Sequence, residues 1–371
     1  MDLNDLPIID GHGHPLLRDP WAILPERFCQ FFTEGRPGTM SEHLVYAGYF
    51  QRALTGMAEL LGSTATVGAV LERRRAVGPE RAREALTAAR IDALLVDTGY
   101  PPDAMSLDEM RRLMPCAIHE IVRSESCAQE LLGAGLAWDG FVEAYRRTLM
   151  ERAATAVSLK SIIAYRSGLA IRPWSAGEAR ASYQQAVERL RATGSPRLTD
   201  KPVLDTLFGV TLDVGIETGR PVQVHAGWGD TDIDLPLANP TLLRPILEDR
   251  RWREARIVVL HQAYPFVREA AFLAAVWPQV YLDLSLAIPY LGPGAVGPLV
   301  EILSLAPWSK LCYGSDVQGL PELFALSAGW GRAALGEALD WLEARRGLGP
   351  VDGRDVARRI LSENARTLYR I

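Results

Sequence analysis

The feature that most constrains this chain is a series of eight short, apolar, β-rich segments that alternate with stretches of helical pattern. The segments are residues 7–10, 93–97, 117–122, 156–163, 221–224, 257–260, 280–284 and 310–313. Most are continuously apolar, as strands are when both faces of a sheet are covered. Alternating strands and helices predict a parallel sheet. Eight such units predict an α/β fold of the (β/α)₈ TIM-barrel type.

The gaps between the segments are uneven. Helical patterns fill residues 177–192, 204–217, 265–276 and 331–346. The first gap is the longest, and it contains an aromatic run and the Arg-rich stretch 71–90. Structureless loops of this length are uncommon. We therefore expect a single barrel domain over residues 1–371, with a helical insertion or lid at residues 15–90. Its Arg/Glu run is typical of a solvated helix face.

Composition excludes several classes of function. Among 371 residues, 40 are basic and 45 acidic, so the net charge of −5 argues against binding to nucleic acid or to an anionic membrane surface. The uncharged run 284–300 approaches membrane-spanning length, but its three prolines favour a strand followed by a loop. The N-terminus lacks the pattern of a signal peptide, and the four cysteines show no CxxC spacing. We expect a cytoplasmic protein acting on a small molecule, and a homo-oligomer from base rates alone.

Four of the six histidines follow predicted strands. His12 and His14 are two residues apart, so on a strand both imidazoles point to the same face and can bind one metal ion. His225 and His261 follow the fifth and sixth segments, and Asp316 follows the eighth. Taken singly, each has a structural interpretation, for example Asp316 as a helix N-cap. At the carboxyl ends of barrel strands, however, all five converge on one face.

Lys160 stands between apolar residues of the fourth segment. A lysine is costly to bury unless it is neutralised, paired or modified. Three interpretations follow: an N6-carboxylated lysine that bridges two metal ions, an ion pair with an acidic neighbour, or a substrate-binding ammonium.

The strings IIDGHGH, VHAGWGD, VLHQAYP and YGSD, together with a lysine in a mid-chain strand, resemble the amidohydrolase superfamily. Within it, the chain is similar to the metal-dependent hydrolases grouped with aminocarboxymuconate-semialdehyde decarboxylase. It is more similar to the amidohydrolase-like region of FluG-type proteins, through DALLVDTGYP, LKSIIAYRSGL, GSDVQGLPELF and ILSENARTLY. The resemblance covers nearly the whole chain.

The resemblance implies that His12, His14 and Asp316 bind one divalent metal, with zinc as the first expectation. His225 and His261 then bind a second metal, or contact the substrate and the hydrolytic water. Lys160 becomes the bridging carbamate if the site holds two ions.

The predicted reaction follows from this ligand set. A metal-bound water ionises near neutral pH, and Asp316 is placed to act as general base, with His261 as a second catalytic residue. We predict a metal-dependent amidohydrolase that cleaves an amide-type C–N bond of a small polar substrate. A decarboxylase or lyase uses the same ligands and is the first alternative. A non-catalytic barrel that only binds its ligand is the second.

Residues that follow the strands are candidates to face the substrate. Arg166 offers a bidentate clamp for a substrate carboxylate, and its alternative role is an ion pair with an acidic loop residue. The full set is Tyr165, Arg166, Trp228, Gln262, Tyr264, Gln318 and Glu322.

Overall fold

The structure, a computed structural model, describes residues 1–371. Its eight strands form one sheet in the order β1 to β8, a nearly closed (β/α)₈ barrel. The strands are β1 (Ile8–Gly13), β2 (Ile91–Asp97), β3 (Ala117–Arg123), β4 (Ser158–Ser161), β5 (Val222–Val224), β6 (Ile257–Val259), β7 (Val280–Asp283) and β8 (Leu311–Cys312). Beside β1, Gly11 N donates to Tyr313 O at 2.9 Å. Each strand overlaps one of the eight predicted segments, which confirms the predicted fold class.

Backbone contacts divide the chain into two compact units. The first comprises Met1–His119, Gly229–Thr231 and Asp283–Thr367. The second comprises Glu120–Trp228, Asp232–Leu282 and Leu368–Ile371. Each unit is therefore assembled from segments that are far apart in the sequence.

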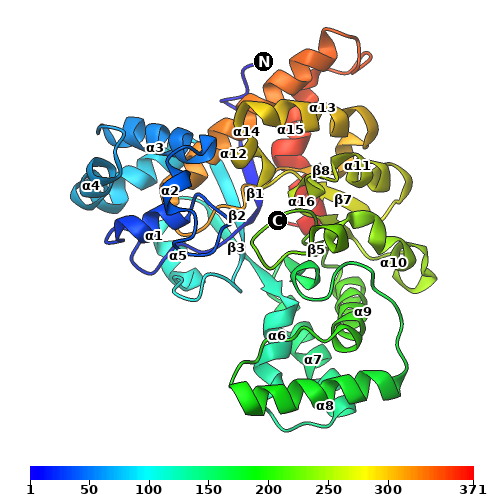
Figure 1. Ribbon diagram of the computed structural model, residues 1–371. Helices are drawn as coiled ribbons and strands as arrows, with labels where there is room; N and C mark the ends of the chain where they lie inside the picture. The colour runs from blue at the N-terminus through cyan, green and yellow to red at the C-terminus, as the bar shows by residue number, and fades with distance from the viewer. The chain divides into compact units, whose positions relative to one another are not determined.

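Four helices of the first unit lie between β1 and β2: α1 (Pro25–Gln30), α2 (Ser41–Leu44), α3 (Gly48–Leu61) and α4 (Val67–Ala88). Figure 1 shows α3 and α4 side by side in blue. Gly78, with φ of 59°, interrupts α4 just before Pro79. The expectation of a wholly solvated Arg/Glu face is wrong for one residue, because Arg74 is fully buried. A lid role for these helices stays a prediction.

The other helices of the first unit follow β2, β7 and β8: α5 (Leu107–Leu113), α12 (Ala287–Leu291), η6 (Gly292–Ala295), α13 (Val296–Leu305), η7 (Trp308–Lys310), α14 (Pro321–Glu343), α15 (Gly353–Arg358), η8 (Arg359–Glu363) and, continuing into the second unit, α16 (Asn364–Tyr369). By length and composition alone, Ala287–Leu305 passes as one membrane-spanning helix, which is weak evidence. The predicted loop there is instead two short helices that pack on α14. Because Pro321 is a favourable first helical residue, α14 begins ten residues before the predicted start.

The second unit holds α6 (Ser124–Leu132), α7 (Trp138–Ala153), η1 (Ile163–Tyr165), α8 (Ala176–Thr193), α9 (Lys201–Thr218), η2 (Leu235–Ala238), η3 (Pro240–Leu243), α10 (Arg244–Glu248), η4 (Arg250–Trp252), η5 (His261–Ala263) and α11 (Val267–Val276). In Figure 1, α7 and α8 lie beside α9. The predicted helices at 177–192, 204–217 and 265–276 correspond to α8, α9 and α11. Across the whole chain, the four cysteines form no disulfide.

Candidate functional site

In the first unit, the carboxyl end of β1 and the segment that follows β8 bring two imidazoles against one carboxylate. Asp316 Oδ1 lies 3.1 Å from His12 Nε2 and 3.2 Å from His14 Nε2. The His12 side chain is fully buried, whereas that of Asp316 is 14% exposed. Asp316 has a left-handed backbone with φ of 58°, and its N–H donates to His12 O at 2.8 Å. Aspartate and asparagine adopt this conformation more readily than most residues. The structure thus brings together all three of the ligands predicted in this unit.

The hydrogen bond of His14 indicates its tautomer, and therefore which ring nitrogen has a lone pair directed at Asp316. His14 Nδ1 lies 3.3 Å from the carbonyl oxygen of Asp97, and a carbonyl only accepts, so Nδ1 carries the hydrogen. In its neutral form, His14 directs its Nε2 lone pair at the Asp316 carboxylate. Two acceptors 3.2 Å apart repel each other unless a cation or a proton lies between them. Ligand atoms about 2.0–2.2 Å from one tetrahedral zinc ion are about 3.3 Å apart. The two separations from Asp316 Oδ1 therefore match those between ligands of one divalent cation.

Asp10, a buried carboxyl group, lies two residues before His12 in β1. Asp10 Oδ1 accepts from Ser315 N at 2.9 Å. Burial raises the pKa of Asp10 to about 7, although the hydrogen bonds from Ser315 oppose the shift. Sequence reasoning did not single out Asp10, yet its two-residue spacing from His12 within IIDGHGH was a usable signal.

The second unit contributes a pair of buried histidines. His225, after β5, and His261, after β6, are 3% and 1% exposed, and His225 Nδ1 lies 3.0 Å from His261 Nε2. The Tyr165 ring packs against His225 with centroids 4.2 Å apart. These contacts fix the positions of the two imidazoles, whose predicted roles are metal binding or contact with substrate and water.

Unusual backbone conformations hold the loop after β6. His261, Gln262 and Ala263 have consecutive φ values of 62°, 56° and 48°. Such conformations carry strain in non-glycine residues and cluster at functional sites. Gly227 approaches this loop so closely that an added Cβ atom would lie 2.3 Å from Tyr264 O. A glycine is therefore required after His225, and it allows the loops that follow β5 and β6 to pack together.

Lys160 lies inside β4 and is only 2% exposed. In the sheet register it stands level with Arg123 of β3 and Gln223 of β5. Side chains two residues apart share a face, so His225 is one step nearer the carboxyl end of β5 than Gln223. Lys160 therefore lies one layer deeper than the position that a bridging ligand level with His225 would occupy.

The predicted substrate-facing residues have different environments. In the first unit, Gln318 is partly buried, and its Oε1 has no hydrogen-bond partner. In the second, Gln262 is fully buried, Trp228 N donates to Tyr264 O at 2.8 Å, and Arg166 follows Tyr165 at the end of η1.

Glu322 does not face a substrate, which corrects the prediction. Its side chain is 1% exposed and pairs with Arg74, Nε to Oε1 at 2.8 Å and Nη2 to Oε2 at 3.0 Å. Both oxygens of the carboxylate are thus engaged by one guanidinium.

The insertion supplies a carboxyl group that sequence reasoning missed. The Tyr290 hydroxyl of α12 donates to Glu34 Oε1 at 2.8 Å. Burial, with smaller contributions from the charges of Asp316 and Asp230, raises the pKa of Glu34 to about 7, although the hydrogen bond from Tyr290 opposes the shift. No local spacing marks Glu34, because its surroundings come from residues far along the chain.

Glu34 is expected to make stability depend on pH. Its pKa in the folded protein exceeds the ordinary value of 4.5, so its contribution is fully present below about pH 4.5 and is lost as the pH rises through about 7. Glu34→Gln stays neutral throughout. The melting temperature of this variant relative to wild type should therefore be higher at about pH 8 than at about pH 5. An equal difference at both pH values would contradict this assignment.

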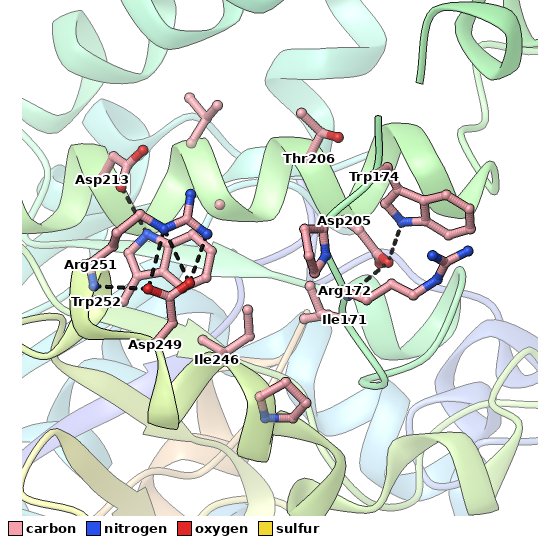
Figure 2. A pocket seen from close by; sticks show the side chains of 14 residues that line it. Ile171, Arg172, Trp174, Asp205, Thr206, Asp213, Ile246, Asp249, Arg251 and Trp252 are labelled. Carbon is pink, nitrogen blue, oxygen red and sulfur yellow. Dashed lines mark hydrogen bonds and ion pairs between the residues drawn. The ribbon is translucent and has the colours of Figure 1, made fainter. Parts of the chain in front are cut away.

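A separate pocket of about 270 Å³ lies in the second unit between residues of α9, the 171–174 segment and the 245–252 region (Figure 2). Its carboxylates are already engaged: Asp205 accepts from Trp174 Nε1 at 2.8 Å, and Asp213 accepts from Trp252 Nε1 at 2.8 Å. Its lining includes no histidine or cysteine. The pocket thus offers neither an imidazole nor a thiol, and its carboxylates already have partners within the protein.

Comparison with known proteins gives consistent matches. A family model described as Amidohydrolase matches residues 172–371, more than half of the chain. Protein fluG of Emericella nidulans is 28% identical over 362 residues, covering 86% of this chain, which spans only 41% of that relative's length. A solved structure from Lactobacillus casei, described as a metal-dependent hydrolase, is 27% identical to this chain. The two superpose with a TM-score of 0.88, and the match covers 99% of this chain and 96% of the Lactobacillus casei chain. Uronate isomerase of Thermotoga maritima shares the fold, with 14% identity and a TM-score of 0.69. That match covers 99% of this chain and 95% of the isomerase chain.

Proposed function

Because the chain belongs to the amidohydrolase family, we propose that it is a metal-dependent hydrolase that cleaves an amide-type C–N bond of a small polar molecule. The observation that carries the proposal is the Asp316 carboxylate facing the Nε2 atoms of His12 and His14. With His14 Nδ1 donating to Asp97 O, the Nε2 atom faces the carboxylate, as it would in a pair of ligands to one cation.

Zinc is the metal that we propose. Two imidazoles and one carboxylate form a ligand set that zinc accepts, with a position left for substrate or water. In a parallel barrel the residues that follow the strands share one end. On that basis we assign His225 and His261 to the same centre, as further ligands or as contacts to the substrate and the attacking water.

The chemistry divides between the ion and the protein. When bound, the ion supplies Lewis acidity toward the scissile carbonyl. Asp316 accepts the proton of the attacking water and passes it to the departing nitrogen, so the acid and the amine leave in equal amounts. The buried pair His225–His261 orients the water and the substrate through imidazole nitrogens fixed by their 3.0 Å contact.

Product analysis tests the reaction class. We expect the zinc-loaded protein, given a panel of N-acylated amino acids and amides of dicarboxylic acids, to release acid and amine in equal amounts. Carbon dioxide release without amine would show that the decarboxylase alternative is right. Binding without turnover across the panel would favour the non-catalytic barrel.

Metal content tests the centre itself. Wild type is expected to hold one zinc ion per chain, and His12→Ala is expected to lose most of it, because one of the proposed ligands is removed. Since Lys160 lies one layer below His225, Lys160→Ala should leave the count unchanged. A wild-type count near two that falls in Lys160→Ala would instead establish a bridging carbamate. Protein without bound divalent metal would contradict the proposed function.

A further inference from the structure

The loop that follows β4 is rigidly held. Ile163 O accepts hydrogen bonds from the backbone N–H groups of Arg166, Ser167 and Gly168 at 2.9–3.1 Å. Gly168, with φ of 80°, packs on Leu237 of η2, where an added Cβ atom would lie 2.8 Å from the Leu237 side chain. The loop therefore presents its side chains in a fixed position rather than as a mobile surface segment.

Two adjacent side chains of this loop have donors without partners. The Nε atom of Arg166 is buried and has no hydrogen-bond partner, and the same is true of Ser167 Oγ. The partial burial of Arg166, followed by the charges of Arg197 and Arg123, lowers its pKa. Burying a guanidinium without an anion is costly. The protein itself supplies no acceptor to Arg166 Nε or Ser167 Oγ.

The two acidic groups whose charges act on Arg166, Glu125 and Asp232, are already engaged. Glu125 Oε1 accepts from Ser161 Oγ at 2.6 Å and from Ile162 N at 3.0 Å. Asp232 pairs with Arg197 at 2.7 Å. The structural alternative considered for Arg166, an ion pair with an acidic loop residue, does not occur.

The position of the loop connects these donors to the candidate site. Tyr165, the residue before Arg166, packs against His225 with ring centroids 4.2 Å apart. His225 in turn contacts His261. Arg166, with its unpartnered Nε, therefore follows directly after a residue that contacts the histidine pair.

We propose that Arg166 and Ser167 bind a carboxylate of the substrate. The substrate class is then a small molecule that combines a free carboxylate with the scissile C–N bond, such as an N-acylated amino acid or a half-amide of a dicarboxylic acid. The assignment of the scissile bond rests on the proposed function, whereas the carboxylate site rests on the loop. A guanidinium recognises a carboxylate through two parallel N–H bonds, and the Ser167 hydroxyl adds a third donor.

Calorimetry on the metal-loaded protein tests the carboxylate site without requiring turnover. Glutarate and glutaramide, which have the same length, are the probes. We expect wild type to bind glutarate about tenfold or more tightly than glutaramide, the range for hydrogen bonds to charged groups. Arg166→Gln should abolish the preference, and Arg166→Lys should keep part of it, because it retains the charge but not the fork. Arg180→Gln, which removes an exposed partner of Asp139, is the matched control and should keep the preference.

The outcomes separate this proposal from the reaction class. Equal binding of the two probes, binding of neither, or a preference that survives in Arg166→Gln overturns the carboxylate site, even if amine release shows hydrolysis. A preference that Arg166→Gln abolishes supports the site, even if the panel shows no C–N cleavage. Glutarate that binds through the metal ion alone would persist in Arg166→Gln, which is one of the overturning results.

Discussion

Asp316→Asn is expected to lower kcat by about 10²–10⁴-fold, the range for loss of a general base. Asparagine is nearly isosteric and tolerates the left-handed backbone at φ of 58°, so the fold should be retained. What disappears is the negative charge that faces His12 and His14 at 3.1 and 3.2 Å, and with it the ability to accept a proton. Steady-state kinetics on a substrate found by the product panel measure the effect.

The control for this variant is Asp108→Asn, which removes an exposed carboxylate paired with Arg111 on α5. It should keep wild-type kcat. Circular dichroism and metal content of both variants show whether fold and ion are retained. Activity of Asp316→Asn within tenfold of wild type, at equal metal content, would show that another residue is the base.

Glu322→Gln is expected to destabilise the protein by about 3–5 kcal/mol, because it leaves the Arg74 guanidinium buried without its counter-charge. The side chains of Arg74 and Glu322 are 0% and 1% exposed, so water cannot replace the lost partner. Arg74 also lies over the Trp21 ring at 5.4 Å, which confines it further. Denaturant unfolding measures the difference.

The matched control lies on α4, the helix that carries Arg74. Arg81 and Glu84 form an exposed pair on α4, so Glu84→Gln should cost about 1 kcal/mol or less. Replacing the buried pair together, Arg74→Met with Glu322→Leu, should recover much of the lost stability, because no unpaired charge is left inside. If Glu322→Gln and Glu84→Gln cost the same, the buried pair does not stabilise the fold as argued.

The barrel was predictable because its signal is local and repeated. Each strand is a short apolar run, and each run overlaps the observed strand. The placement of His12, His14 and Asp316 followed from their positions just after strand segments, and the structure brings these three together. Regular periodicity and strand-end position were enough for this part.

What could not be predicted depends on distant partners. The arginines of α4 have the pattern of a solvated face, and nothing in the run 71–90 distinguishes Arg74 from its neighbours. Its burial follows from a carboxylate 248 positions away. Glu34 is similar, because Tyr290 becomes its neighbour only in the folded chain. The depth of Lys160 required the strand register, which sequence alone does not define.

The first unit combines segments that are far apart in the sequence, and this limits the order in which the protein can fold. Residues 1–119 belong to the same compact unit as residues 283–367. During synthesis the N-terminal part therefore has to wait for the last quarter of the chain before its ion pair with Glu322 and its contact with Asp316 can form. Contacts of such long range slow folding. A nascent chain released before Asp316 is translated would lack the carboxylate that His12 and His14 face, however well its earlier helices had formed.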